Sequence, residues 1–534
     1  MNILIPTTSI EKIRQSLVRK TELLVFLSLV LISIVSFTVY LQNGLGLSYN
    51  DARSHLDIGR RVVEGLKPGL AQLGSVWLPL THLLMVPTIW NDFMWHTGLA
   101  GALQSMIAFV VTGMLIFKFL ERINVGILGR LIGVFIFVAN INVLYLQSTA
   151  MTELLLLAFM TAGCYYLLLW HQKDSLVDLI KSSFFIMLSS LIRYDGWFLL
   201  VMAAGLVVIQ TFRKKGYKAT EGTTLIFLTM GGIGIALWFL WNLLIFKDPL
   251  YFMFGPFSAY VQQRQLLEAG VLATKGNLLL STKIYFYAFM YNAYTIPAII
   301  AFFGAISFWT DKKYSSSVRF ASSALIAPLI FNILALYLGH SVLFVQGLSG
   351  NTWFNVRYGM MLMPTIAIFV GYLMERAKSI RPTLIGILMF ITFFAFANQD
   401  AVTIDDARVG SSQKNVTEVS GWLYKNAKDQ KGFILISVAS HDAIIFSSGL
   451  PMKRFIHEGT GLYWDAATQI PDKWARWIIM RTHDDNDLTW KFVSRSKGFD
   501  RFVKVGAYPF ADIYELKPEF LPELTTDPVF GKQK

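Results

Sequence analysis

Residues 23–41 read LLVFLSLVLISIVSFTVYL and contain no charged side chain. A helix needs about 20 such residues to cross the hydrocarbon core of a bilayer. Similar apolar runs recur at 97–117, 131–146, 154–170, 176–192, 196–212, 222–246, 284–310, 320–338, 358–374 and 382–398. The run at 176–192 is the weakest, because Asp178 and Lys181 lie near its start, but a consistent topology needs it. The sequence therefore predicts an α-helical polytopic membrane protein with about 11 transmembrane helices.

The composition of the whole chain is that of a membrane protein. Of its 534 residues, 54% are hydrophobic and only 15% are charged, whereas a soluble domain carries roughly 25% charged residues. The mean hydropathy is +0.51. These values exclude a soluble enzyme, a disordered chain and a fibrous repeat.

The net charge of +13 belongs to the membrane-rich part of the chain. Residues 400–534 contain 18 basic and 18 acidic side chains, so the whole excess lies before them. A groove for nucleic acid would be a continuous basic patch on a folded domain. Here the excess forms short clusters between apolar runs, as topology signals do. We therefore expect a lipid bilayer, and no nucleic acid, as a partner.

The basic clusters also indicate orientation, because cytoplasmic connections are enriched in Lys and Arg. The clusters lie on one side of the predicted bundle, at 14–20, 118–122, 213–218, 312–319 and 376–381. We expect this side, and the N-terminus, to be cytoplasmic. An odd number of spans then places the C-terminal tail outside. The expected location is the plasma (inner) membrane. No small-residue cleavage site follows the first span, so we do not expect it to be a cleaved signal peptide.

The sequence divides into a membrane domain, 1–399, and an outer domain, 400–534. About 135 residues can bury a modest core of their own. The segments at 432–438, 502–505 and 511–516 are typical of strands, and those at 422–427 and 473–479 are typical of helices. We therefore predict a small C-terminal α/β domain outside the cytoplasm.

Ionisable side chains recur at the predicted outer ends of the spans. They are Asp51, Glu153, Arg193, Asp195 and Arg357. All except Arg357 also have a local explanation: Asp51 as a helix N-cap, Glu153 as a favourable charge at a helix N-terminus, and Arg193 as a partner of Asp195 or of lipid headgroups. Burying such charges costs about 2.5–3.5 kcal/mol at the centre of a span, so charges of both signs at one level favour a polar cavity open to the outer side.

The first outer loop adds two candidate interfacial segments. Residues 52–66 place His55 and Gly59 on one stripe, the spacing of an amphipathic helix that lies on the membrane. Residues 76–90 are apolar but short, and Pro79 and Pro87 interrupt them. We read them as a second interfacial or re-entrant segment.

These motifs resemble the integral-membrane glycosyltransferases of the C-type (GT-C) superfamily, in particular the branch of protein O-mannosyltransferases and aminoarabinose transferases. In that family an acidic residue follows the first span and two juxtamembrane helices lie in the first outer loop. Here Tyr49-Asn50-Asp51-Ala52-Arg53 stands at that place, with Ala52 where the family usually has a second acid. The remaining matches are Trp77-Leu78-Pro79-Leu80, Thr152-Glu153, Arg193-Tyr194-Asp195, Asp248-Pro249-Leu250 and Arg357-Tyr358. The Lys that often precedes paired prolines in the family is absent before Pro79.

The resemblance implies transfer of a sugar, with inversion, from a polyprenyl-phosphate donor to a hydroxyl of a glycan, lipid or protein acceptor outside the cytoplasm. A phosphate leaving group has a second pKa near 6 and needs cations rather than a proton donor. One carboxylate then suffices as general base, whereas glycoside hydrolases also need an acid.

The implied roles follow the motifs. Asp51 is the expected base, and Arg193 and Arg357 are the expected phosphate ligands, because a guanidinium matches phosphate oxygens. The other expected substrate-binding residues are Glu153, Asp195, Tyr358, His55 and Arg264. Glu153 and Asp195 would orient the arginines, bind sugar hydroxyls or hold a divalent cation, and no cofactor is otherwise implied. The alternative for Arg264 is a solvated loop charge.

Two other classes of protein are compatible with a polytopic sequence. A membrane transporter of a lipid-linked or polar substrate would perform no covalent chemistry and would place its ionisable residues near the bilayer midplane. A receptor-like scaffold would bind through its outer domain and would not need Asp51.

Overall fold

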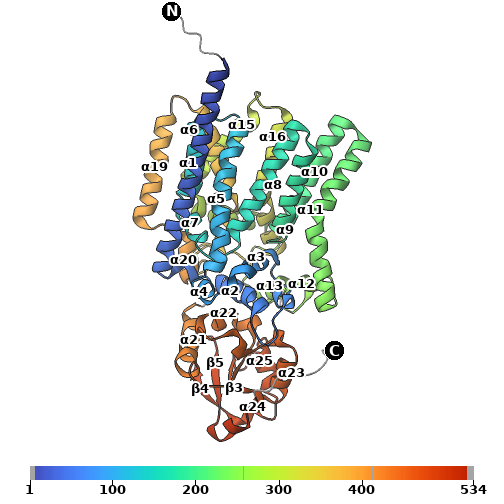
Figure 1. The fold of residues 1–534 in the computed structure, drawn as a ribbon, viewed down its shortest axis with the longest axis vertical. Helices are drawn as coiled ribbons and strands as arrows, with labels where there is room; N and C mark the ends of the chain where they lie inside the picture. Colours follow the sequence, from blue (N-terminus) through green and yellow to red (C-terminus); the bar gives the residue numbers. More distant parts are fainter. Residues whose placement is uncertain (1–6, 257, 410–412, 526–534) are drawn as a thin grey trace, which may run out of the picture.

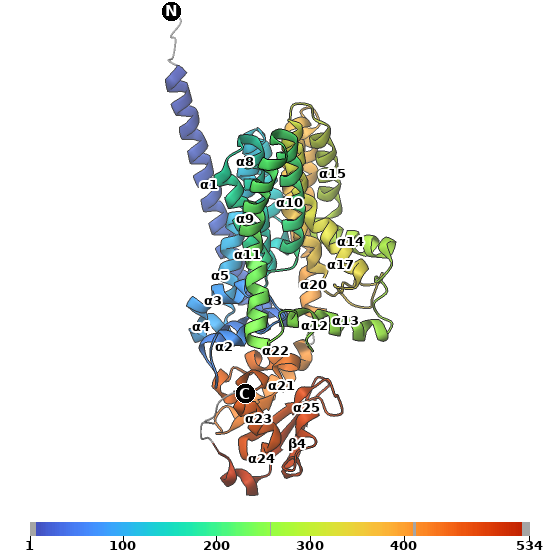
Figure 2. The ribbon, with the colours of Figure 1, turned by 90° about the vertical axis from the view of Figure 1, so that its right-hand side faces the viewer.

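A bundle of long helices stands on a small α/β domain in the computed structural model, which describes residues 7–256, 258–409 and 413–525 (Figure 1). Helix α1 (Thr7–Gln42) begins at one end of the bundle, and the α/β domain lies at the opposite end. Figure 2 shows that α13 (Ala259–Glu268) and α14 (Leu278–Ala293) lie on the side of the bundle opposite α1.

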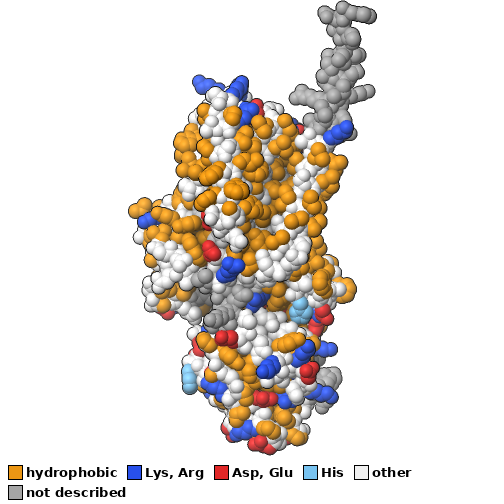
Figure 3. Space-filling view, turned by 90° about the vertical axis from the view of Figure 1, so that its left-hand side faces the viewer, with side chains coloured by type: hydrophobic (Ala, Val, Ile, Leu, Met, Phe, Trp, Pro, Cys, Tyr) orange, Lys and Arg blue, Asp and Glu red, His pale blue; other side chains and the backbone are white. Residues whose placement is uncertain are grey.

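Hydrophobic side chains cover the outside of the bundle, whereas charged side chains gather on the α/β domain and at the far end of the molecule (Figure 3). Among the described residues, eight stretches are long and apolar enough to cross a membrane. They are Lys20–Gln42 of α1, α5 (Leu99–Arg122), α8 (Glu153–Lys173), α10 (Asp195–Lys215), α11 (Tyr217–Phe246), Ser316–Leu338, Val356–Arg376 and Arg381–Arg408. The prediction of a polytopic helical membrane protein is confirmed.

The remaining predicted spans are helical but short or broken. The short ones are α6 (Ile127–Val138), which α7 (Ile141–Leu146) follows, and α9 (Leu176–Ser190). The prediction of one continuous helix through 284–310 is wrong, because α14 and α15 (Thr295–Thr310) are bent by 106° relative to each other.

A network of asparagines surrounds the break between α14 and α15. Tyr294, between the two helices, has a φ of 61°, which ends the helical hydrogen bonding. The carbonyl oxygen of Asn292 accepts hydrogen bonds from Asn140 Nδ2 at 2.8 Å and Asn142 Nδ2 at 3.3 Å. Non-helical backbone at membrane depth is tolerated only where such partners are buried with it. The bend therefore depends on residues that lie far away in the sequence.

The last three membrane stretches end the bundle. They comprise α16 (Ser316–Ser322) and α17 (Ala327–Leu338), η4 (Val356–Leu362) and α18 (Met363–Arg376), and α19 (Arg381–Asn398) and α20 (Val402–Val409). Helix α20 belongs to the sequence assigned to the outer domain, but it packs against the bundle. The Thr403 backbone N–H and hydroxyl both donate to Asn142 Oδ1, at 3.0 and 2.8 Å.

The first outer loop forms three helices between the bundle and the outer domain (Figure 1). They are α2 (Asn50–Val63), α3 (Leu80–Ile89) and α4 (Asp92–His96). The prediction of a helix near 52–66 is confirmed, but α2 does not lie open on a membrane surface. Its residues from Ala52 to Arg61 are mostly buried, because the bundle covers one face and the outer domain covers another.

The face of α2 toward the outer domain carries three polar side chains at helical spacing, which contact α22 (Val438–Ser448). Arg53 Nη1 donates to Ser447 Oγ at 2.9 Å. Asp57 Oδ2 accepts from the Phe446 backbone N–H at 3.1 Å. Arg61 Nη1 lies 2.6 Å from Asp442 Oδ1. Because i, i+4 and i+8 lie on one helix face, this stripe fastens the outer domain to α2.

The outer domain contains a five-stranded sheet with the order β2-β1-β3-β5-β4. The strands are β1 (Phe433–Ile436), β2 (Phe455–Ile456), β3 (Ala475–Met480), β4 (Phe502–Ala507) and β5 (Asp512–Leu516). Strands β2, β1 and β3 are parallel, and β5 is antiparallel to β3 and β4. In register, Ile434 lies opposite Trp477, and Ile478 opposite Tyr514.

The α/β character of the outer domain is confirmed, with one error in an element. The prediction of a helix at 473–479 is wrong, because residues 475–480 form the central strand β3, whose side chains are mostly buried on both faces. A short apolar run in a fully buried strand has no alternation that would distinguish it from a helix. The flanking helices include α21 (Gln413–Ala427), α23 (Leu462–Gln469) and α25 (Leu488–Val493).

Candidate active site

Arg357 forms the centre of a cluster of charged side chains at the end of the bundle that faces the outer domain. It is the second residue of η4, after Val356, and Asn355 before them has a φ of 54°, which turns the chain at this point. Its guanidinium Nη2 lies 2.6 Å from Asp51 Oδ2, and its Nε lies 3.0 Å from Glu153 Oε1. The Arg357 side chain is only 5% exposed, so these contacts are made in a poorly hydrated environment.

Helix starts position the two carboxylates. Asp51 lies in the first turn of α2, and Glu153 is the first residue of α8. The partial positive charge at a helix N-terminus favours a carboxylate there. Asp51 is not the N-cap, since Tyr49 holds that position, and no side-chain capping bond is present. The alternative interpretation, in which Asp51 is the N-cap of this helix, is therefore wrong.

Arg193 joins the same cluster through Glu153. Arg193 Nη1 lies 3.5 Å from Glu153 Oε1, and its Nε lies 3.3 Å from Asp195 Oδ2. The local pair of Arg193 with Asp195 is thus present, but it is one part of a larger network. Asn332 Nδ2 lies 3.4 Å from Asp195 Oδ1 and fixes its other oxygen.

Tyrosine rings line the two guanidiniums. The Tyr358 ring centroid lies 4.5 Å from the Arg193 guanidinium carbon and 5.3 Å from that of Arg357. The Tyr49 ring centroid lies 4.9 Å from the Arg357 guanidinium carbon. A cation is attracted to the face of an aromatic ring, more strongly where water is excluded. These rings therefore hold the arginines in place without removing their charge.

Asp406 on α20 is a site residue that sequence reasoning missed. Its Oδ2 lies 3.8 Å from Arg357 Nη1 and accepts a hydrogen bond from the Tyr49 hydroxyl at 3.2 Å. The available signal was its position: Asp406 follows the last apolar run closely and on the same side as Asp51. It was hidden because the sequence after 400 was assigned as a whole to the outer domain.

The cluster contains more carboxylates than guanidiniums. Two arginines meet Asp51, Glu153, Asp195 and Asp406, and Glu153 Oε2 is buried with no hydrogen-bond partner among the described residues. The side chain of Asp51 is 43% exposed, whereas those of the other three are almost completely buried. Asp51 is therefore the carboxylate of the cluster that is most accessible from solvent.

The donor set does not fit a divalent cation. Arg357 lies between the carboxylates of Asp51 and Glu153, so these do not converge on a common point. In the described part of the chain, no three His, Cys, Asp or Glu side chains are grouped so that they could hold a metal ion. We therefore derive no step through a metal.

His55 and Arg264 occupy different surroundings. His55 lies one turn after Asp51, and its Nδ1 is 2.9 Å from His82 Nε2 on α3. Burial, together with the nearby Arg357 and Arg193, lowers the pKa of His55 to about 3, so it is neutral. Arg264 lies on α13 with its side chain 67% exposed and pairs with Glu268 at 2.9 Å. The structure does not bring Arg264 into the cluster. Its exposure agrees with the alternative interpretation, a solvated charge in the connection between spans.

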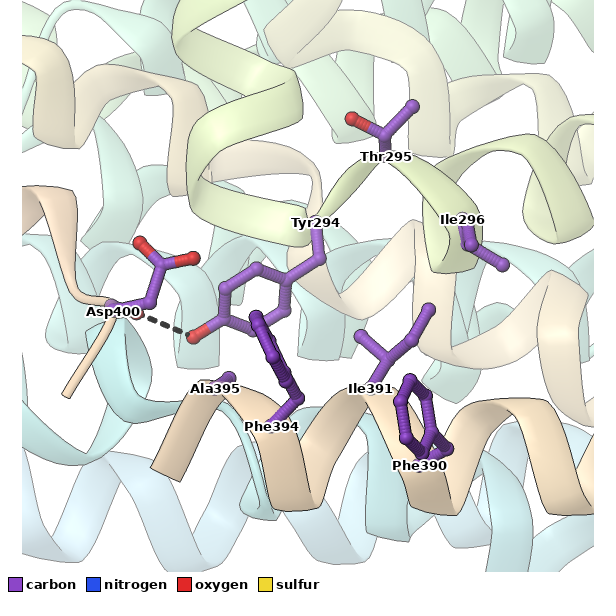
Figure 4. Close-up of a pocket in the computed structure, with 8 residues that line it drawn as sticks. All are labelled: Tyr294, Thr295, Ile296, Phe390, Ile391, Phe394, Ala395 and Asp400. Carbon is purple, nitrogen blue, oxygen red and sulfur yellow. Dashed lines mark hydrogen bonds between the residues drawn. The ribbon is translucent and has the colours of Figure 1, made fainter. Parts of the chain in front are cut away.

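An apolar cavity of about 240 Å³ lies between the start of α15 and α19 (Figure 4). Its lining includes Tyr294, Phe390 and Phe394, and the Asp400 carboxylate lies beside the Tyr294 ring. The Tyr294 hydroxyl donates to the Asp400 carbonyl oxygen at 2.8 Å. A carboxylate at the polar end disfavours an anionic headgroup, so this cavity does not fit the phosphate of a lipid donor.

Comparisons with known proteins place the fold. No protein-family model matches the sequence, and no curated protein shows significant similarity to it. Among solved structures, ArnT from Cupriavidus metallidurans bound to undecaprenyl phosphate is similar over 91% of this chain and 98% of its own, with a TM-score of 0.54 and 10% identity. The apo state of ArnT gives a TM-score of 0.50 and 12% identity, over the same 91% and 98%.

An oligosaccharyltransferase from Archaeoglobus fulgidus, solved in complex with Zn and sulfate, is similar over 85% of this chain and 67% of its own, with a TM-score of 0.48 and 10% identity. At such low identity a likeness shows the fold alone. The likeness to ArnT over nearly the full length of both chains shows that this chain has the same fold as ArnT.

Proposed function

We propose that this protein is a glycosyltransferase that moves a sugar from a polyprenyl-phosphate donor to a hydroxyl of an acceptor outside the cytoplasm. The observation that carries the proposal is the cluster around Arg357, in which one accessible carboxylate, Asp51, stands beside two guanidiniums held by buried acids. The structure of ArnT with undecaprenyl phosphate, a protein of the same fold, supports a donor of this class.

In the proposed reaction Asp51 acts as general base. Its exposed oxygen takes the proton of the acceptor hydroxyl, and the acceptor oxygen forms a bond to the anomeric carbon of the sugar. The bond from that carbon to the phosphate oxygen breaks, and its electron pair leaves with the polyprenyl phosphate. Attack opposite the leaving group inverts the anomeric centre. A positioned base of this kind contributes about 10²–10⁴-fold to the rate.

The two arginines differ in their proposed roles. Arg357 is surrounded by Asp51, Glu153 and Asp406, so its main role is to orient the base. Arg193 has a more exposed side chain, and its contacts with Glu153 and Asp195 are longer. We therefore assign Arg193 as the principal phosphate ligand, where its charge stabilises the leaving group without a proton.

A transporter is the second candidate, because α14 and α15 form a broken helix, which is typical of transporter binding sites. In a transporter, however, ionisable residues gather at the break. Here the side chains that donate to the backbone at the break are the neutral Asn140 and Asn142. Asp400 is the charged residue beside Tyr294, and the paired charges lie around Arg357. The geometry therefore favours transfer chemistry. The proposed location is the plasma membrane, with the N-terminus in the cytoplasm.

Genetic complementation with glycan analysis tests the proposal. Cells that lack the protein are supplied with the wild type, with Asp51→Asn, or with Arg264→Met as a control outside the cluster. We expect mass spectrometry to show a glycan that is lost in the deletion, restored by the wild type and Arg264→Met, and not restored by Asp51→Asn. Thermal unfolding should show that both variants fold. Full restoration by Asp51→Asn would exclude Asp51 as the base.

A further inference from the structure

The outer domain carries a second cavity, of about 510 Å³, between α23 and the end of α25. In Figures 1 and 2, α23 lies farther from the bundle than α22 does, so this cavity is separate from the Arg357 cluster. Helix α23 contributes Trp464, Asp465, Thr468 and Gln469 to the lining, and α25 with the following turn contributes Phe492, Arg495, Ser496 and Lys497.

One wall of the cavity is aromatic. The Phe492 side chain lies at the surface, with the residue 48% exposed, and its ring is braced edge-on against the buried ring of Trp464, with centroids 6.4 Å apart at 88°. This arrangement fixes the phenyl ring and presents apolar surface to water. A sugar ring has faces of C–H groups that can cover such a surface, while its hydroxyls remain free for polar partners.

Unpaired cations stand beside the aromatic wall. Within the described residues, Arg495 and Lys497 form no ion pair, and no side-chain hydrogen bond of theirs is present. Three other arginines of the outer domain are paired with carboxylates. Arg476 lies 3.3 Å from Glu515, Arg481 lies 3.1 Å from Asp484, and Arg501 lies 2.8 Å from Asp472.

The polar side chains of α23 complete the lining. Asp465 and Gln469 are exposed at the cavity, and their side chains likewise have no partner among the described residues. Asp465 and Gln469 lie one turn apart. The carboxylate of Asp465 can accept hydrogen bonds from hydroxyls, and the amide of Gln469 can both accept and donate them. The cavity therefore combines an aromatic face, two free cations and free groups for hydroxyl recognition.

We propose that this cavity binds an acidic saccharide. The sugar ring covers Phe492, its carboxylate or phosphate group binds Arg495 and Lys497, and its hydroxyls bind Asp465 and Gln469. The inference rests on the proposed function only in one respect: the bound saccharide would be part of the acceptor, whose class would then be an acidic glycan. Binding itself requires no transfer.

The test measures binding to the full chain in lipid nanodiscs by isothermal titration calorimetry. The probes are tetragalacturonate, which carries carboxylates, maltotetraose, a neutral saccharide of the same length, and tripolyphosphate, which has charge without a sugar. We expect tetragalacturonate to bind at least about tenfold more tightly than either other probe, since hydrogen bonds to charged groups are worth about that factor each.

Variants separate the parts of the site. Phe492→Ala and the double change Arg495→Gln with Lys497→Gln should each weaken tetragalacturonate binding by at least about tenfold. Lys453→Gln, an exposed cation elsewhere on the domain, should have no effect. Thermal unfolding should show that each variant is folded. If one of these variants unfolds, the single surface change Arg495→Gln replaces it, and the affinity of this variant for tetragalacturonate decides whether the cations bind the probe.

The outcomes distinguish this inference from the proposed function. Equal binding of maltotetraose, tripolyphosphate binding as tight as that of tetragalacturonate, or no binding of any probe would each overturn the saccharide site. Asp51→Asn should bind tetragalacturonate as the wild type does. Loss of the cellular glycan in Asp51→Asn together with no binding of the probe would leave the proposed function standing without this site.

Discussion

Replacing Arg61 with methionine tests whether α2 fastens the outer domain to the bundle. Arg61 Nη1 lies 2.6 Å from Asp442 Oδ1, and the two side chains are only 8% and 10% exposed. Methionine keeps much of the aliphatic stem and removes the charge. Asp442 and its neighbour Asp57 are then left without their cation.

The expected cost follows from the burial of this pair. Removing one partner of a buried ion pair costs about 3–5 kcal/mol, because the other charge stays buried and unpaired. The carboxyl pair can respond by binding a proton, which limits the loss, so we expect the lower value, about 3 kcal/mol. At roughly 3 °C for each kcal/mol, the unfolding temperature of the outer domain should fall by about 10 °C.

Arg264→Met is the matched control, since it makes the same change in an exposed pair. The Arg264 and Glu268 side chains are 67% and 63% exposed, and an exposed pair contributes little to stability because water and salt screen it. Thermal unfolding followed by circular dichroism gives the comparison, and hydrogen exchange should show faster exchange in α2 and α22 for Arg61→Met alone. Equal shifts in the two variants would refute the reasoning.

Three further predictions concern pH, the cluster and the helix break. Burial raises the pKa of Asp442 to about 6 and that of Asp57 well above its usual value. The state in which the outer domain is docked on α2 therefore binds more protons than the separated parts. Docking should be strongest near pH 4 and weaken as the pH rises through about 6. Hydrogen exchange of α22 measures this change. Arg357→Lys, whose single ammonium cannot hold Asp51 and Glu153 together, should lower donor turnover by about 10²-fold or more, measured with radiolabelled polyprenyl-phosphate sugar. Asn292→Ala removes the donor to the Val356 carbonyl and should lower stability by about 1–3 kcal/mol, measured by thermal unfolding.

The sequence predicted the bundle well, because membrane insertion requires long apolar runs that are visible in the chain itself. It did not predict the break at Tyr294. The run at 284–310 contains no charged residue, and its bend depends on hydrogen bonds from Asn140 and Asn142, which only the folded bundle brings near. Strand β3 was misread for a related reason, since burial on both faces removes the alternation that marks a strand.

The charged cluster was more visible than the helix break. Arg193 and Arg357 lie in short outer connections, where basic residues are disfavoured, and the structure brings both to Glu153. Asp406 escaped notice because nothing in the sequence separates α20 from the outer domain. Arg264 was expected at the site but lies outside it, because the sequence does not show where the connection that contains a charged residue will lie in the fold.

The order in which the chain is made has a consequence for Glu153. During synthesis this carboxylate enters the bilayer edge long before Arg357, which follows it by 204 residues. Arg193, the other cation within reach of Glu153, emerges much earlier and lies 3.5 Å away in the finished protein. Arg193 can thus pair with Glu153 during biogenesis, until the later helices bring Arg357 to the same carboxylate.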